Sequence, residues 1–166
     1  MSSGKKKQVV AKKTGKTTIR KAVKQDSMLQ ARIVNGLGAM KKAHKKLVVS
    51  TLHKEFDDSL DIDEAFRKGH DEENRWDYLL GHKSANKLIA LEPHSANDGE
   101  VSTVINKRTA ALDQLREHLS AGRNVAAWLW VASSTVDFAR TEKTVIRLAD
   151  NGITFVGKMV REKHIK

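Results

Sequence analysis

The sequence predicts an α/β fold in which helices flank a mixed β-sheet, and three observations support this prediction. Two short apolar segments separated by a turn, residues 76–80 and 87–92, have the pattern of a β-hairpin. A long amphipathic helix is expected over residues 100–119. The almost wholly apolar segment 125–131 follows it and is typical of a central strand covered on both faces. Strand, helix and strand therefore form a crossover unit, which we expect to be right-handed.

The other elements follow from local patterns. A helix is expected from residue 26 onward, because its apolar residues recur at spacings of three and four. These residues are Leu29, Ile33, Leu37 and Met40. A short helix is expected over 62–68, a second amphipathic helix over 141–150, and a last strand over 153–156. The predicted order from residue 76 is β-β-α-β-α-β.

Charge divides the chain into a basic arm and a nearly neutral remainder. Residues 1–46 contain 14 Lys and Arg and one acidic residue, a net charge of +13. Residues 47–166 contain 17 basic and 19 acidic residues, a net charge of −2. Residues 1–25 also have few large apolar side chains to bury. We therefore expect a disordered basic arm over residues 1–25 and a single α/β domain over residues 26–166.

Composition and motifs exclude several classes. Cysteine is absent, so the chain has no disulfide framework, zinc finger or thiol nucleophile. It contains neither a zinc-protease HExxH motif, nor a glycine-flanked serine elbow, nor a glycine-rich dinucleotide loop after a strand. No apolar segment of about 7–15 residues follows the positive N-terminus as in a secretory signal. The longest apolar run is shorter than the roughly 20 residues of a membrane span. We expect a cytoplasmic protein without a membrane partner.

The basic residues predict nucleic acid, DNA or RNA, as the partner, because lysine and arginine neutralise phosphates and speed encounter with a polyanion. A solubilising tail, or an arm that binds an acidic protein, is the alternative. The predicted nucleic-acid-binding residues are Lys5, Lys6, Lys7, Lys12, Lys13, Lys16, Arg20, Lys21, Lys24, Lys41, Lys42, Lys45, Lys46 and Arg108.

The hairpin carries the candidate chemistry. If its turn lies around residues 84–85, positions whose numbers sum to about 169 face one another, so Asp77 lies beside Glu92. Two adjacent carboxylates repel unless a cation lies between them, and their oxygens suit Mg²⁺ or Mn²⁺. His94, two residues beyond Glu92, would orient water or stabilise negative charge. Lys107 and Arg108 on the following helix would approach a scissile phosphate.

Over about residues 62–132 this arrangement resembles the PD-(D/E)xK nuclease-like superfamily, which includes restriction enzymes and Holliday-junction resolvases. Its core is a mixed sheet flanked by helices, with a metal-binding Asp on one strand and a (D/E)-x-K pair on the next. Here Asp77 and Glu92 match the two acids, His94 stands at the lysine position, and Trp76 replaces the proline before the first acid.

The resemblance implies a restriction-endonuclease-like core and Mg²⁺-dependent cleavage of phosphodiester bonds. Asp77 and Glu92 would be the metal ligands, His94 would assist, and Lys107 would supply the missing positive charge. The alternative is a non-catalytic nucleic-acid-binding or accessory protein on a similar scaffold. In that case Asp77 pairs with a hairpin lysine, and Glu92 and His94 only end a strand.

Overall fold

The computed structural model describes residues 15–69, 74–137 and 142–165, and their strands form one sheet in the order β1-β2-β3-β4-β5-β6. The strands are β1 (Val34–Asn35), β2 (Phe56–Asp61), β3 (Tyr78–His82), β4 (Lys87–Asn97), β5 (Val125–Asp137) and β6 (Ile153–Phe155). Strands β1 to β4 pair with antiparallel neighbours, whereas β5 is parallel to β4 and β6 is parallel to β5. The prediction of an α/β fold with a mixed sheet is confirmed.

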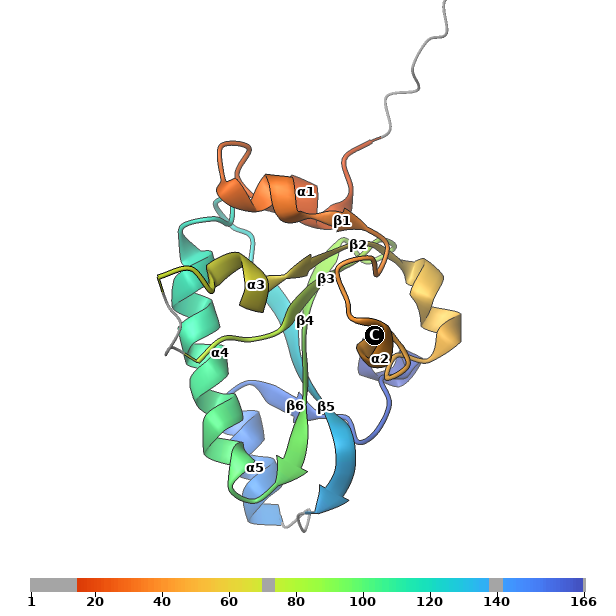
Figure 1. Ribbon diagram of the computed structural model, residues 1–166, viewed down its shortest axis with the longest axis vertical. Coiled ribbons are helices and arrows are strands. Elements are labelled where there is room, and N and C mark those ends of the chain that lie inside the picture. Colours follow the sequence, from red (N-terminus) through yellow and green to blue (C-terminus); the bar gives the residue numbers. More distant parts are fainter. Residues whose placement is uncertain (1–14, 70–73, 138–141, 166) are drawn as a thin grey trace, which may run out of the picture.

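Helices cover both faces of the sheet (Figure 1). One face carries α1 (Thr18–Ala22), α3 (Ile62–Phe66), α4 (Glu100–Arg116) and α5 (Glu142–Asp150). The other face carries α2 (Lys42–Lys45), the 3₁₀ helix Ser50–Glu55 and the C-terminal 3₁₀ helix Glu162–His164. Each face has its own apolar cluster, with Trp76 and Trp128 in the first and Tyr78 and Leu129 in the second.

The predicted order β-β-α-β-α-β is present as β3-β4-α4-β5-α5-β6. The predicted hairpin register is also present, since Tyr78 pairs with Leu91 and His82 with Lys87. Along β4 the side chains alternate between the two clusters, with Ala90 in the first and Leu91 in the second. Glu92 therefore belongs on the face covered by α4.

The predicted arm boundary at residue 25 is wrong. Residues 1–14 lie outside the described residues, but α1 is part of the fold and Ile19 is fully buried. The buried carboxylate of Asp58 accepts the backbone N–H of Ile19 at 2.8 Å and that of Arg20 at 3.2 Å. These bonds attach the start of α1 to strand β2, satisfying donors that lack partners at a helix N-terminus. Composition hides this anchor, because the exposed lysines outnumber the few apolar residues that pack.

The predicted helix from residue 26 is also wrong. The chain forms a 3₁₀ helix over Met28–Arg32, then β1, and then turns at Gly36, whose φ is +56°. The apolar residues are buried as expected, but Leu29 and Ile33 belong to the first cluster, whereas Leu37 and Met40 belong to the second. The spacing therefore does not reflect one helical face. The chain passes around the edge strand β1 and buries the first two residues on one face of the sheet and the last two on the other.

Candidate active site

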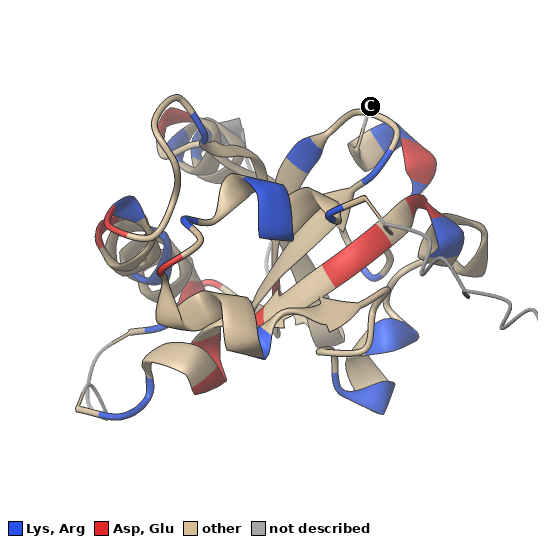
Figure 2. Ribbon diagram, turned by 90° about the horizontal axis from the view of Figure 1, so that it is seen from above, with Lys and Arg blue, Asp and Glu red and all other residues tan. Residues whose placement is uncertain are grey.

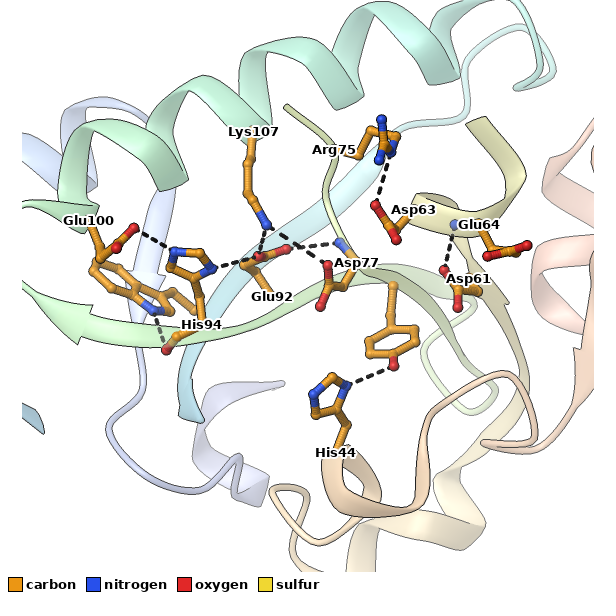
Figure 3. A network of polar contacts seen from close by, with 12 residues as sticks. His44, Asp61, Asp63, Glu64, Arg75, Asp77, Glu92, His94, Glu100 and Lys107 are labelled. Carbon is orange, nitrogen blue, oxygen red and sulfur yellow. Dashed lines mark hydrogen bonds and ion pairs between the residues drawn. The ribbon is translucent and has the colours of Figure 1, made fainter. Parts of the chain in front are cut away.

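The two predicted carboxylates meet where β3 begins. Asp77 directly precedes β3, and Glu92 lies opposite in β4, one position beyond the Tyr78–Leu91 pair. The backbone N–H of Asp77 donates to Oε2 of Glu92 at 2.8 Å. The pairing predicted from the turn position therefore holds, and Figure 3 shows both side chains where the chain enters β3 beside β4.

Lys107 reaches the pair from α4, which packs on the same face. Its Nζ donates to Oε1 of Glu92 at 2.5 Å and lies 3.9 Å from Oδ1 of Asp77. The ammonium group thus lies against both carboxylates, in the place where the sequence predicts a cation. Lys107 and Glu92 are 15 residues apart, and the crossover from β4 into α4 brings them together.

His94 extends the cluster on the other side of Glu92. Its Nδ1 lies 3.4 Å from Oε1 of Glu92, and its Nε2 lies 2.6 Å from Oε2 of Glu100, the first residue of α4. The indole N–H of Trp130 donates to the backbone carbonyl of His94 at 3.3 Å. The hydrogen bonds with Glu92 and then with Glu100 raise the pKa of His94, so the two carboxylates favour its protonated form.

Glu100, His94, Glu92, Lys107 and Asp77 therefore form a row in which acidic and basic groups alternate (Figure 3). Glu92, at its centre, is fully buried, and its two oxygens accept from the Asp77 backbone and from Lys107. A buried carboxylate needs such partners, because transfer of an unpaired charge out of water is very costly.

Asp77 differs from Glu92, because among the described residues its carboxylate has a single ion-pair contact, the 3.9 Å one with Lys107. Burial, and next the charge of Glu92, raise the pKa of Asp77 to about 7. Its side chain remains 22% exposed, so solvent and ligands have access to it. A carboxylate held in an environment that disfavours its charge is typical of functional sites.

Asp77 and Glu92 are the two side chains for which the sequence predicts a divalent cation. In the part of the chain that is described, no group of three or more His, Cys, Asp or Glu side chains is arranged to hold a metal ion. Mg²⁺ does not require such a group, since one or two carboxylates with water and substrate phosphates commonly bind it. The oxygens of Asp77 and Glu92 are of the kind that Mg²⁺ and Mn²⁺ prefer, while both oxygens of Glu92 already accept hydrogen bonds, from the Asp77 backbone and from Lys107.

Two side-chain contacts near the site escaped the sequence analysis. Tyr78, next to Asp77 in the chain, places its hydroxyl 2.8 Å from Nδ1 of His44 on the opposite face of the sheet. On the α4 face, Asp63 pairs with Arg75 at 2.9 Å. His44 lies in the predicted basic segment, but nothing in the local pattern indicates that this segment folds back to β3.

Two predicted phosphate-binding residues have other roles. The guanidinium of Arg108 lies 5.2 Å from the centre of the Trp128 ring, and burial lowers the pKa of Arg108. Adjacent residues of a helix point about 100° apart, so Arg108 and Lys107 leave α4 in different directions, and the role of Arg108 at a phosphate stays a prediction. The guanidinium of Arg20 donates to Thr17, Asn35 and the carbonyl of Ile33, which tie α1 to the β1 edge.

The remaining predicted basic residues lie at the surface where they are described. Lys16, Lys21, Lys24, Lys41, Lys42 and Lys46 are exposed, and Lys45 is half-buried. Lys5, Lys6, Lys7, Lys12 and Lys13 lie outside the described residues. Figure 2 shows Lys and Arg on helices and loops at several sides of the molecule, so the described domain has no single basic face.

Comparison of the chain with protein-family models, with curated proteins and with solved structures found no match in any of the three. Among the described residues, none of the helices has the length and apolar character needed to cross a membrane.

Proposed function

We propose that this protein acts on nucleic acid and that Asp77, Glu92, His94 and Lys107 form a metal-dependent phosphodiesterase site of the PD-(D/E)xK-like kind. The observation that carries the proposal is that Asp77, Glu92 and Lys107 lie in contact with one another where β3 begins. The order of β3, β4, α4 and β5 supports it, because an antiparallel hairpin followed by a helix and a parallel strand agrees with the mixed, helix-flanked core of that superfamily.

In this proposal Asp77 and Glu92 would hold Mg²⁺ or Mn²⁺, which would supply polarisation of a phosphoryl oxygen and a lower pKa for bound water. Lys107 leaves its contact with Asp77 and donates to a phosphate oxygen, because its ammonium already lies at the carboxylate pair. His94, favoured in its protonated form by Glu92 and Glu100, stabilises negative charge that develops on the substrate. Residues 1–14, with five lysines, add affinity that does not depend on sequence.

A cleavage assay tests this function. The protein is incubated with plasmid DNA, structured DNA or RNA in Mg²⁺ or Mn²⁺, beside the nearly isosteric variants Asp77→Asn and Glu92→Gln. We expect metal-dependent cleavage that each variant reduces at least about 100-fold, because each removes a metal ligand. Asp113→Asn is the matched control, since Asp113 is an exposed residue of α4 paired with Arg116. Cleavage at the unaltered rate by both site variants would contradict the assigned site.

A second hypothesis, a non-catalytic nucleic-acid-binding protein, is favoured by one observation. Lys107 contacts both carboxylates and both oxygens of Glu92 have donors, so Glu92 is satisfied without a metal. This hypothesis predicts binding to nucleic acid without cleavage in any divalent cation. It also predicts that Mg²⁺ leaves the thermal midpoint unchanged, whereas a site that binds Mg²⁺ raises it.

A further inference from the structure

A second set of polar groups lies on the opposite face of the sheet, also near the start of β3. Tyr78 directly follows Asp77, and adjacent strand residues point to opposite faces, so its ring lies in the second cluster on the side of α2. There its hydroxyl accepts the backbone N–H of Lys41 at 3.2 Å and contacts Nδ1 of His44 at 2.8 Å. Figure 3 shows His44 across the strand from the carboxylates, and Figure 1 shows α2 and α4 on opposite faces.

These contacts favour one tautomer of His44. Tyr78 is 2% exposed, and among the described residues Nδ1 of His44 is the acceptor within reach of its hydroxyl proton. With the hydroxyl as donor to Nδ1, the proton of a neutral imidazole lies on Nε2. Burial and next the charge of Lys41 lower the pKa of His44, which favours the neutral form. In this tautomer Nε2 of His44 is an N–H donor, and it has no hydrogen-bond partner among the described residues.

The surroundings of His44 suit a phosphate. Lys41 is exposed and its charge acts on His44, and Lys42 and Lys46 are exposed in the same short segment. The carboxylates of Glu92 and Asp61 also lie close enough to act on the pKa of His44, although more weakly than burial does. His44 thus lies between the acidic row on one face and the exposed Lys41 on the other, and an N–H donor beside a cation is a favourable combination for a phosphate oxygen.

We propose that His44 and the lysines of the 41–46 segment bind the phosphate next to the one that reaches Asp77 and Glu92. The substrate is then a polynucleotide that is also bound at a flanking phosphate, rather than a mononucleotide or a small phosphodiester. This inference rests on the proposed function for the position of the reacting phosphate, whereas binding of the flanking phosphate is measurable without any cleavage.

Binding is measured first, with the full chain, EDTA, and a labelled DNA duplex of about 20 base pairs at about 150 mM salt, which weakens exposed long-range contacts. We expect His44→Ala to weaken binding about fivefold, the effect of one lost hydrogen bond. His44→Gln, whose amide nitrogen can reach the place of Nε2, should stay within about twofold of the original affinity. Lys42→Ala should weaken binding and lower the salt slope by about 1.

Lys87→Ala is the matched control, because Lys87 is an exposed lysine at the other end of β4. Equal losses in His44→Ala, Lys42→Ala and Lys87→Ala would overturn the inference, as would unchanged affinity in the first two. Thermal midpoints of all variants identify any loss that reflects unfolding, and in that case the His44→Gln result decides.

Cleavage in Mg²⁺ supplies the second measurement. On the duplex, His44→Ala should raise KM with little change in kcat, whereas on a dinucleotide, whose single phosphodiester has no flanking phosphate, it should change neither. An equal effect on both substrates would overturn the inference. If the original protein shows no cleavage but His44→Ala still weakens binding, the proposed function is wrong and binding of the flanking phosphate by His44 is supported. If cleavage depends on Asp77 but His44→Ala leaves the affinity unchanged, the proposed function is supported and the inference about His44 is wrong.

Discussion

Replacing Asp77 with asparagine should stabilise the protein, and more so at high pH. The pKa of Asp77 is raised from 3.8 to about 7, first by burial and then by Glu92. A carboxyl with a raised pKa binds its proton more tightly in the folded state than in the unfolded state. The folded state therefore carries no penalty below about pH 4, loses stability as the pH rises toward 7, and carries the full penalty above it.

The magnitude follows from the same shift. Integrated over pH, it corresponds to about 4 kcal/mol at pH 8 and about 2 kcal/mol at pH 5, with each pKa unit equal to about 1.4 kcal/mol. The side chain is 22% exposed, so water screens part of this cost, and we expect about half of it. Asparagine keeps the shape and carries no charge at either pH. Asp77→Asn should then raise the free energy of unfolding by about 2 kcal/mol at pH 8 and by about 1 kcal/mol at pH 5.

Urea unfolding at both pH values, without divalent cations, measures the difference, and thermal midpoints should rise by about 2–4 °C for each kcal/mol. Asp113→Asn is again the control, since the side chain of Asp113 is 67% exposed and its loss should change stability little at either pH. An Asp77→Asn variant that is destabilised at pH 8, or equally stabilised at both pH values, would refute the assigned cause. Confirmation would mean that the fold tolerates a costly carboxylate at this position, as functional sites often do.

Two further predictions concern the N-terminal segment. Gly81→Ala should destabilise the protein by about 1–3 kcal/mol in urea unfolding, because the added Cβ would lie 2.0 Å from Oδ1 of Asp58, which anchors α1. Gly15→Ala meets no atom within 4 Å and should be neutral, so equal effects would contradict this reason. Deleting residues 1–14 removes five lysines and should lower the salt slope of DNA binding by as much as about 4.5, measured by titration between about 50 and 200 mM salt. An unchanged slope would leave the arm without its assigned role.

The local sequence pattern was sufficient to predict the elements from β3 to β6, in which the apolar residues recur with a clear period. The apolar segment that became β5 and the stripe of α4 need only their own residues to be recognised. Strand β2 escaped, because Asp57 and Asp58 interrupt it with charges that a local pattern assigns to the surface. Those carboxylates face α1, 38 to 39 residues away in the chain, and accept its backbone N–H groups. A partner at that separation leaves no local signal.

The candidate site was predictable to the same extent. Asp77 and Glu92 followed from the position of one turn, because hairpin register fixes which residues face one another. Lys107 followed from the direct passage of β4 into α4. The roles of Arg108 and His44 did not follow, since the first depends on the angle at which α4 packs against Trp128 and the second on a loop that crosses the sheet edge.

The adjacency of Asp77 and Tyr78 connects the two faces. Because strand side chains alternate, one residue places a carboxylate among Glu92 and Lys107, and the next places a hydroxyl against His44 on the far side. The carboxylate of Asp77 and the hydroxyl that contacts His44 are therefore held at a fixed spacing by two consecutive residues. A one-residue slip of β3 against β4 would exchange the two faces and disrupt both proposed sites together. The burial of Tyr78, Leu79 and Leu80 in alternating clusters opposes that slip, since each would move into the wrong core.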